Sequence, residues 1–196
     1  MSAPPKHKLN MERPFSAHHM LLQTAQRSLE AAKKRSAGYL YDELVTVVFS
    51  ALGIEAFCNT VGERIFESDW LSEHERKSPT EKLELLAGKL DITYNVKAEP
   101  WVAAIWLFDF RNRIAHAKPE FVKPDEKALT QKQFDVSQFK NCFPTSTLEN
   151  KINLSNAQRA FTAADEIKKL FCDVIPPEYA RGLYVDSASG SFFLSE

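Results

Sequence analysis

The stretch from Pro100 to His116, PWVAAIWLFDFRNRIAH, constrains the fold of this 196-residue chain more than any other. Pro100 suits the first turn of a helix, where the missing proline N–H would have no partner within the helix. Asp109 is the one clearly polar residue between Pro100 and Arg111, and a helix that is apolar on every side is typical of a protein interior. The sequence therefore predicts a core helix around which the other elements pack.

The end of this predicted helix is polar, with Arg111, Asn112, Arg113 and His116 close together. Burying cations and an imidazole costs free energy, so this end must open at a surface, an interface or a binding site. Successive side chains advance by about 100° around a helix, so one face carries Asp109, Asn112, Arg113 and His116. Arg111 lies about 140° from His116. One helix would not aim both at the same atom, but two helices related by a two-fold axis could.

The remaining pattern predicts an all-α helical bundle of about five helices. Hydrophobic spacing and capping signals place these helices near residues 16–35, 39–68, 79–90, 100–116 and 155–174. A capping box with proline at the first position, Ser78 to Glu81, is the sharpest helix start, and Ser155 with Gln158 predicts a second box. Gly53 and Gly62 predict a kink or a close helix crossing in the second helix.

The helical signals predict one domain with irregular ends. Residues 1–14 are polar and aperiodic, which predicts a mobile tail. The predicted helical domain spans residues 15–176, with a loop at 71–78 and an irregular insertion at 118–153 in which we expect some short helix or turn. Residues 177–196 are expected to form a C-terminal tail or a small hairpin.

Composition favours one soluble domain. The chain is 44% hydrophobic, which is enough for one core, and its net charge of −1 argues against strong non-specific attraction to nucleic acid or anionic membranes. The three cysteines, Cys58, Cys142 and Cys172, suggest neither a disulfide framework nor a zinc site. We find no signal-peptide pattern and no uncharged apolar run of membrane-spanning length, and therefore expect a cytoplasmic protein without a membrane partner.

The polar helix end also has an ordinary structural explanation. Asp109 and Arg113 have the i,i+4 spacing of a pair that is common on exposed helices. Cations near a helix C-terminus interact favourably with the helix dipole. Glu55 and Glu63 on the second helix are expected either to pair with Arg111 or Arg113 or to lie on a solvated face.

Two other groups of side chains favour structural roles over functional ones. Trp101 and Trp106 could stack on bases, but on so apolar a helix we expect them in the core. His18, His19 and His74 lack the spacing of metal ligands and come with no carboxylate cluster, so no metal site is predicted.

The hexapeptide at residues 111–116, RNRIAH, resembles the Arg-x-x-x-x-His signature of the HEPN superfamily, including the Asn that often follows its Arg. Residues 51–59, ALGIEAFCN, resemble the second helix of many such proteins, and residues 79–83, PTEKL, resemble the segment that often precedes the signature helix. The similarity covers roughly residues 15–119 and, by order of elements, the last helix. It implies an all-α up-and-down bundle, usually a homodimer with the two signature motifs facing each other.

Many HEPN proteins are metal-independent endoribonucleases, often toxins of toxin–antitoxin or phage-defence systems, whereas others are inactive modules for protein or nucleotide binding and dimerisation. The resemblance therefore implies one of two functions. The first is an RNA-cleaving homodimer with no cofactor, with an antitoxin or nucleotidyltransferase as partner. The second is an inactive module for binding and dimerisation. Some members with a nucleotidyltransferase antitoxin carry a tyrosine where this chain has Lys118, so modification at that position is not predicted. The implied catalytic residues are Arg111, Asn112 and His116, the substrate contacts are Arg113 and Lys118, and the supporting residues are Asp109 and Glu55.

Overall fold

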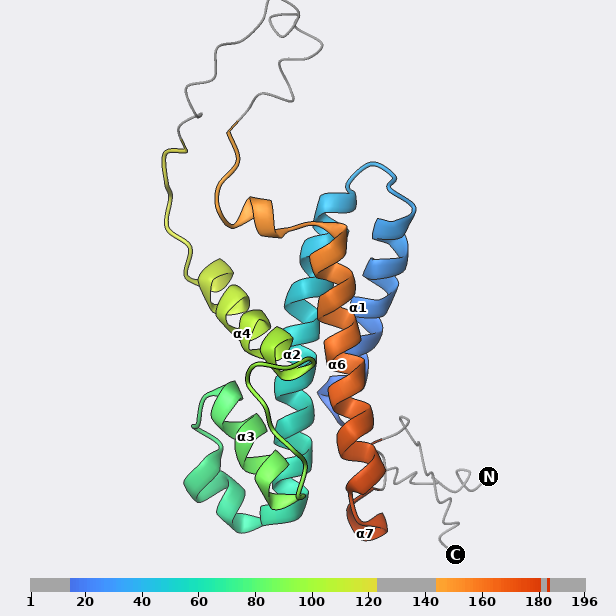
Figure 1. Ribbon diagram of the computed structural model, residues 1–196, viewed down its shortest axis with the longest axis vertical. Coiled ribbons are helices and arrows are strands. Elements are labelled where there is room, and N and C mark those ends of the chain that lie inside the picture. Colours follow the sequence, from blue (N-terminus) through green and yellow to red (C-terminus); the bar gives the residue numbers. More distant parts are fainter. Residues whose placement is uncertain (1–14, 123–143, 181–182, 184–196) are drawn as a thin grey trace, which may run out of the picture.

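A computed structural model describes residues 15–122, 144–180 and 183, and it confirms the predicted all-α helical bundle (Figure 1). No β-strand occurs in these described ranges. The elements are α1 (Ala17–Lys33), α2 (Tyr39–Phe66), the π-helical turn η1 (Trp70–His74), α3 (Pro79–Lys89), α4 (Trp101–Ala115), the 3-10 turn η4 (Glu149–Lys151), α6 (Leu154–Val174) and α7 (Pro177–Ala180).

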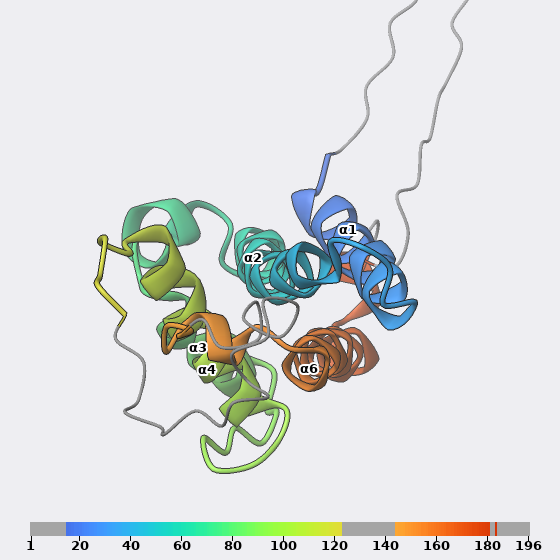
Figure 2. The same ribbon diagram turned by 90° about the horizontal axis from the view of Figure 1, so that it is seen from above.

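The helix at the centre of the bundle is α2, and the expectation that the chain is organised around α4 is wrong. Helix α2 has 28 residues and packs against α1, α3, α4 and α6. Figure 2 shows α2 between α1 and the pair formed by α3 and α4. Helix α4 has only 15 residues, and its Asp109, Asn112 and Arg113 are exposed. A longer helix offers more apolar surface, so α2 packs against each of the other long helices.

The core joins the apolar faces of α2, α4 and α6. Phe57 of α2 is 1% exposed, and its ring lies edge-on to Phe171 of α6, with the ring centroids 6.0 Å apart. Trp101 of α4 packs against the same Phe171 at 6.4 Å. The core position predicted for Trp101 is confirmed, and Trp106 is partly buried and stacked on Phe110. Each side chain of this size stabilises the fold by about 1.5–3 kcal/mol through its burial.

Two helix starts illustrate how local signals compete. Helix α3 begins at the predicted capping box, in which Glu81 N–H donates to Ser78 Oγ and Ser78 N–H donates to the Glu81 carboxylate. Helix α6 begins one residue earlier than predicted because Asn153 caps it, accepting the Asn156 N–H at 2.9 Å. The predicted capping box of Ser155 and Gln158 is therefore wrong, since Ser155 already lies inside the first helical turn.

The predicted irregular segments are partly helical where the structure describes them. The predicted loop at 71–78 begins inside η1, which buried Trp70 fixes against the core. In the 118–153 insertion, η4 is the expected short helix, and residues 123–143 lie outside the described ranges. Helix α7 occupies the start of the segment predicted as a tail or hairpin. The remainder of that segment beyond 183, and the predicted tail at 1–14, also lie outside the described ranges.

Both glycines of α2 lie at the predicted close approaches. A Cβ at Gly53 would lie 2.5 Å from Leu22 Cδ2, the end of a flexible side chain. A Cβ at Gly62 would lie 2.3–2.4 Å from the indole ring of Trp70, which is only 2% exposed. Gly62 therefore allows η1 to pack directly on α2.

We expect Gly62→Ala to lower the free energy of unfolding by about 1–3 kcal/mol, because a buried indole ring must move to make room for the methyl group. Gly88→Ala is the matched control, since Gly88 is exposed on α3 and its added Cβ would meet nothing within 4 Å. That control should raise the free energy of unfolding by up to about 1 kcal/mol through helix propensity. Urea titration measures both values, and two changes of the same sign would contradict the Gly62–Trp70 contact.

Among the described residues, α2 is the one helix long and apolar enough to cross a membrane by length and composition. Half of the apolar stretch concerned is buried inside the bundle. A buried core helix passes the same test, and its packing against four other helices accounts for the composition of α2.

Candidate functional site

Arg111 is directed from α4 onto α2. Its Nη2 donates to Glu55 Oε2 at 2.6 Å, and the two side chains are 23% and 25% exposed. This pair confirms the interpretation in which Glu55 faces the polar end of α4, while Glu63 is exposed. The contact joins residues 56 positions apart and fixes the approach of α4 to the central helix.

His116 lies on a different side of the same helix end. It is the C-cap residue of α4, and its backbone N–H donates to the Asn112 carbonyl at 3.0 Å, so the helix sets its position. The side chains of Asn112, Arg113 and His116 are exposed and line a groove of about 720 Å³ together with Lys118. Arg111 is absent from the described lining of this groove, as the angle of about 140° between Arg111 and His116 predicts.

Asp109 and Glu55, the two predicted supporting residues, make contacts of different kinds. Asp109 is exposed on the outer face of α4 and lies 3.9 Å from Arg113, the predicted i,i+4 pair. Such an exposed pair contributes little to stability. Glu55 binds Arg111 more closely and in a less exposed place, so of these two pairs the Glu55–Arg111 pair has the larger structural effect.

The opposite wall of the groove comes from the turn before α6 and was not among the predicted site residues. It includes Ser146, Thr147 and Glu149. Ser146 N–H donates to Glu149 Oε2 at 2.6 Å, and Glu149 N–H donates to Ser146 Oγ at 3.0 Å. The Ser146 N–H bond to the carboxylate is the main cause that lowers the pKa of the Glu149 carboxyl, and a hydrogen bond from the Ser146 side chain acts in the same direction. The Ser-x-x-Glu spacing of a capping box was the available signal for this turn.

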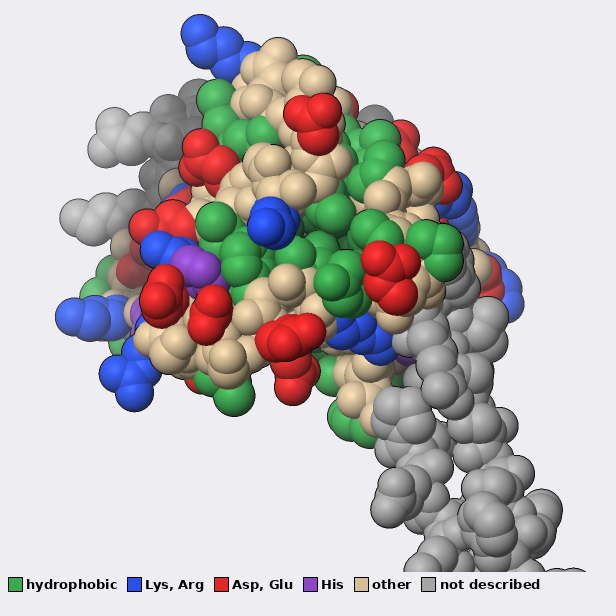
Figure 3. Space-filling model, turned by 90° about the horizontal axis from the view of Figure 1, so that it is seen from below, with side chains coloured by type: hydrophobic (Ala, Val, Ile, Leu, Met, Phe, Trp, Pro, Cys, Tyr) green, Lys and Arg blue, Asp and Glu red, His purple; other side chains and the backbone are tan. Residues whose placement is uncertain are grey.

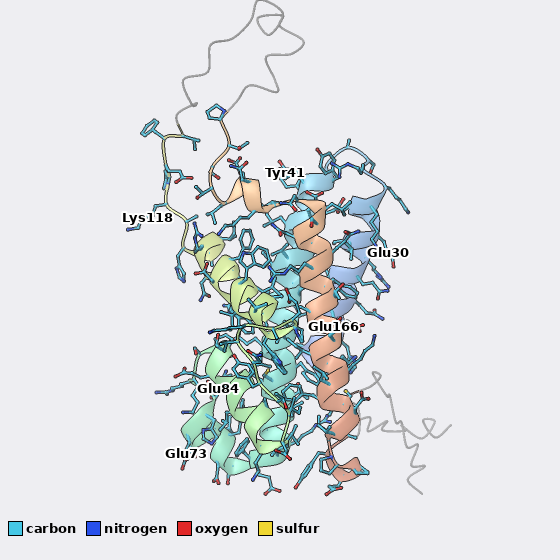
Figure 4. The ribbon with its side chains drawn as sticks, in the orientation of Figure 1. Glu30, Tyr41, Glu73, Glu84, Lys118 and Glu166 are labelled. Atoms are coloured by element: carbon cyan, nitrogen blue, oxygen red, sulfur yellow. The ribbon has the colours of Figure 1, made fainter. Side chains whose placement is uncertain are left out.

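The groove carries charges of both signs. Arg113 and Lys118 are cationic, and Glu120 and Glu149 are anionic. Lys118 follows the C-terminal end of α4, at the opposite end of the molecule from Glu73 (Figure 4). On that opposite end, seen from below, hydrophobic side chains lie among separate acidic and basic ones, and no continuous basic surface is visible (Figure 3). Within the groove, an anionic ligand would find its cations in Arg113 and Lys118.

In the described part of the chain, the histidines outside the groove make ring contacts with neighbouring side chains. His18 is buried beside His19, with the ring centroids 4.0 Å apart, whereas His74 packs against Phe66 and Trp70. Within the described part of the chain, no three His, Cys, Asp or Glu side chains are grouped so that they could hold a metal ion.

No protein-family model, no curated protein and no solved structure matches this chain. The family assignment therefore stays a prediction from the residues quoted above.

Glu55→Gln tests the contact that positions Arg111. We expect a loss of about 1–2 kcal/mol in the free energy of unfolding, because a hydrogen bond between two charged and largely buried groups is replaced by a weaker one. Asp165→Asn is the matched control, since Asp165 pairs with Lys169 at the same distance, 2.6 Å, but on an exposed helix surface. The control should cause a loss too small to resolve by urea titration. Equal losses in the two variants would show that burial of the Glu55–Arg111 pair contributes nothing.

Proposed function

We propose that this chain is a metal-independent endoribonuclease of HEPN type. The observation that supports it is the groove at the end of α4, where Asn112, Arg113 and His116 are exposed together. These three side chains belong to the segment that resembles the HEPN signature. A core helix that ends in an accessible imidazole beside a cation suits acid–base chemistry on a phosphate ester.

The proposed chemistry needs only groups that RNA and protein supply. The ribose 2′-oxygen forms a bond to the adjacent phosphorus while the bond from phosphorus to the 5′-oxygen breaks. The proton of the 2′-hydroxyl passes to a base, and the leaving 5′-oxygen receives a proton. An imidazole exchanges protons near neutral pH, which gives this role to His116. The products are a 2′,3′-cyclic phosphate and a 5′-hydroxyl.

Cations and an amide stabilise the charged phosphate in this proposal. Arg113 and Lys118 attract the RNA backbone from the groove, and Asn112 orients the phosphate or the imidazole. A guanidinium has five N–H donors, and one of those of Arg111 donates to Glu55. Arg111 would bind the scissile phosphate through its other N–H groups. Since Arg111 and His116 diverge on one helix, we infer a homodimer in which both chains contribute to one site.

The biological setting follows from the same resemblance. We infer a cytoplasmic toxin or phage-defence effector, controlled by an antitoxin or nucleotidyltransferase partner. Lys118 stands where modified relatives carry tyrosine, so such a partner would act by binding and not by modification at that position.

A second candidate is an inactive helical module that binds a protein or a nucleotide and dimerises. The observation in its favour is the Glu55–Arg111 pair at 2.6 Å, which gives Arg111 a sufficient structural role without any substrate. The two candidates differ in one measurable property, the cutting of RNA.

The deciding experiment incubates the purified chain with a mixed RNA pool in the presence of EDTA. The proposal expects fragments that end in a 2′,3′-cyclic phosphate and begin with a 5′-hydroxyl, identified by end-specific labelling and mass spectrometry. Products with 3′-hydroxyl ends, or cutting that EDTA abolishes, would contradict it. Intact RNA throughout would favour the binding module.

A further inference from the structure

The groove beside His116 has a wall that the proposed cleavage chemistry does not use. The segment at the end of α4 presents Arg113 and Lys118, which suit a phosphate, followed by Glu120, and the turn before α6 presents Glu149, which would repel a phosphate. A ligand that fills the groove must therefore combine an anionic part with a part that donates hydrogen bonds.

The groove also has an apolar lining. Ile114, Leu148 and Ile152 all line the groove and also pack against the hydrophobic core, so they form a fixed apolar surface. A flat aromatic group can lie on such a surface while its edge remains available for hydrogen bonds.

The Glu149 carboxylate is held in place by the protein. One of its oxygens accepts the Ser146 N–H, and the η4 turn that carries it is tied to α6 through Asn156 Nδ2, which donates to the Lys151 carbonyl at 2.8 Å. A carboxylate has lone pairs for about four hydrogen bonds. Glu149 therefore keeps acceptor capacity for a ligand, is exposed at the groove, and needs no reorganisation to use it.

We propose that Glu149 reads the nucleobase next to the phosphate held by the α4 side of the groove, and that it selects bases with an exocyclic amino group. Carboxylates accept hydrogen bonds from the N4 amino group of cytosine, whereas uracil carries an acceptor oxygen at the same position. Unstacked bases of single-stranded RNA present this edge to a protein. This inference rests on the proposed function for its choice of RNA as ligand.

The test compares binding of short 2′-O-methyl homopolymers of cytidine and uridine by fluorescence anisotropy. The methyl group blocks the 2′-oxygen nucleophile, so affinity is measured without cleavage. The wild-type chain should bind the cytidine polymer about tenfold more tightly. Glu149→Gln should reduce this preference to less than about twofold, because the glutamine amide can donate to the uracil oxygen as well as accept from cytosine. Glu75→Gln, an exposed position outside the groove, is the matched control and should keep the wild-type preference.

The possible results separate this inference from the ribonuclease proposal. Equal affinity for both polymers, no binding, or an unchanged preference in Glu149→Gln overturns the role of Glu149. If RNA is nevertheless cut in EDTA, the proposed function survives that result. A preference that follows Glu149 in a chain that cuts no RNA would support base reading and reject the ribonuclease.

Discussion

His116→Ala is expected to reduce metal-independent RNA cleavage by at least about 100-fold, because general acid–base catalysis by one side chain contributes about 10²–10⁴-fold. His116 is exposed at the C-cap of α4, where alanine removes the proton-transfer group and leaves the helix and its core face intact. Initial rates of cleavage of a labelled RNA in EDTA measure the effect.

Two controls make this result specific. The free energy of unfolding of His116→Ala should equal that of the wild type, since no buried contact is lost. Arg76→Ala, which removes an exposed side chain outside the groove, should cut RNA at the wild-type rate. If His116→Ala cut as fast as the wild type, His116 would have no part in the reaction.

Acidification is expected to destabilise the fold by about 3 kcal/mol through His18 alone. His18 has no exposed surface, packs edge-on against Phe57 and lies 3.4 Å from Thr60 Oγ1 through Nδ1. Burial is the main cause that lowers the pKa of His18 from 6.5 to about 4. The charge of His19 acts in the same direction, a hydrogen bond with the Leu183 backbone acts against it, and the charges of Lys168 and Arg64 lower the pKa further.

The free energy of unfolding falls on acidification because the unfolded chain binds a proton at His18 more readily than the folded chain does. Above pH 6.5 the imidazole is neutral in both the folded and the unfolded chain, so its contribution to stability is fully present. As the pH falls from 6.5 towards 4, the unfolded chain takes up the proton and the folded chain does not, so unfolding becomes more favourable. Below about pH 4 the folded chain also binds the proton, and no further loss arises from His18.

His18→Gln isolates this contribution, because glutamine does not titrate while all other acidic and basic groups remain. Urea titrations across this pH range should show a loss about 3 kcal/mol smaller in the variant than in the wild type. Parallel losses in the two proteins would mean that His18 is protonated in the folded state at mild pH.

Short-range sequence signals were sufficient to predict the positions of most helices of this protein. The Ser78–Glu81 box, the proline boundaries and the hydrophobic spacing depend on residues within one or two turns, so they can be read directly from the chain. The same holds for the divergence of Arg111 and His116, which follows from helix geometry alone. Before α6, both Asn153 and Ser155 are residue types that can cap a helix. Asn153 is the N-cap because its backbone is extended, whereas Ser155 is already helical.

Tertiary packing decided the features that join distant residues. The central position of α2, the partner of Arg111 and the approach of the Ser146–Glu149 turn to the end of α4 all involve segments far apart in the sequence. Helical periodicity shows which side of a helix is apolar, but several neighbours can cover the same apolar side with similar burial. By itself the sequence determined the helices and the polar end of α4. Only the packed bundle determined that Arg111 faces Glu55 while His116 faces a groove. These two contacts require α2 and the turn before α6 to lie beside the end of α4.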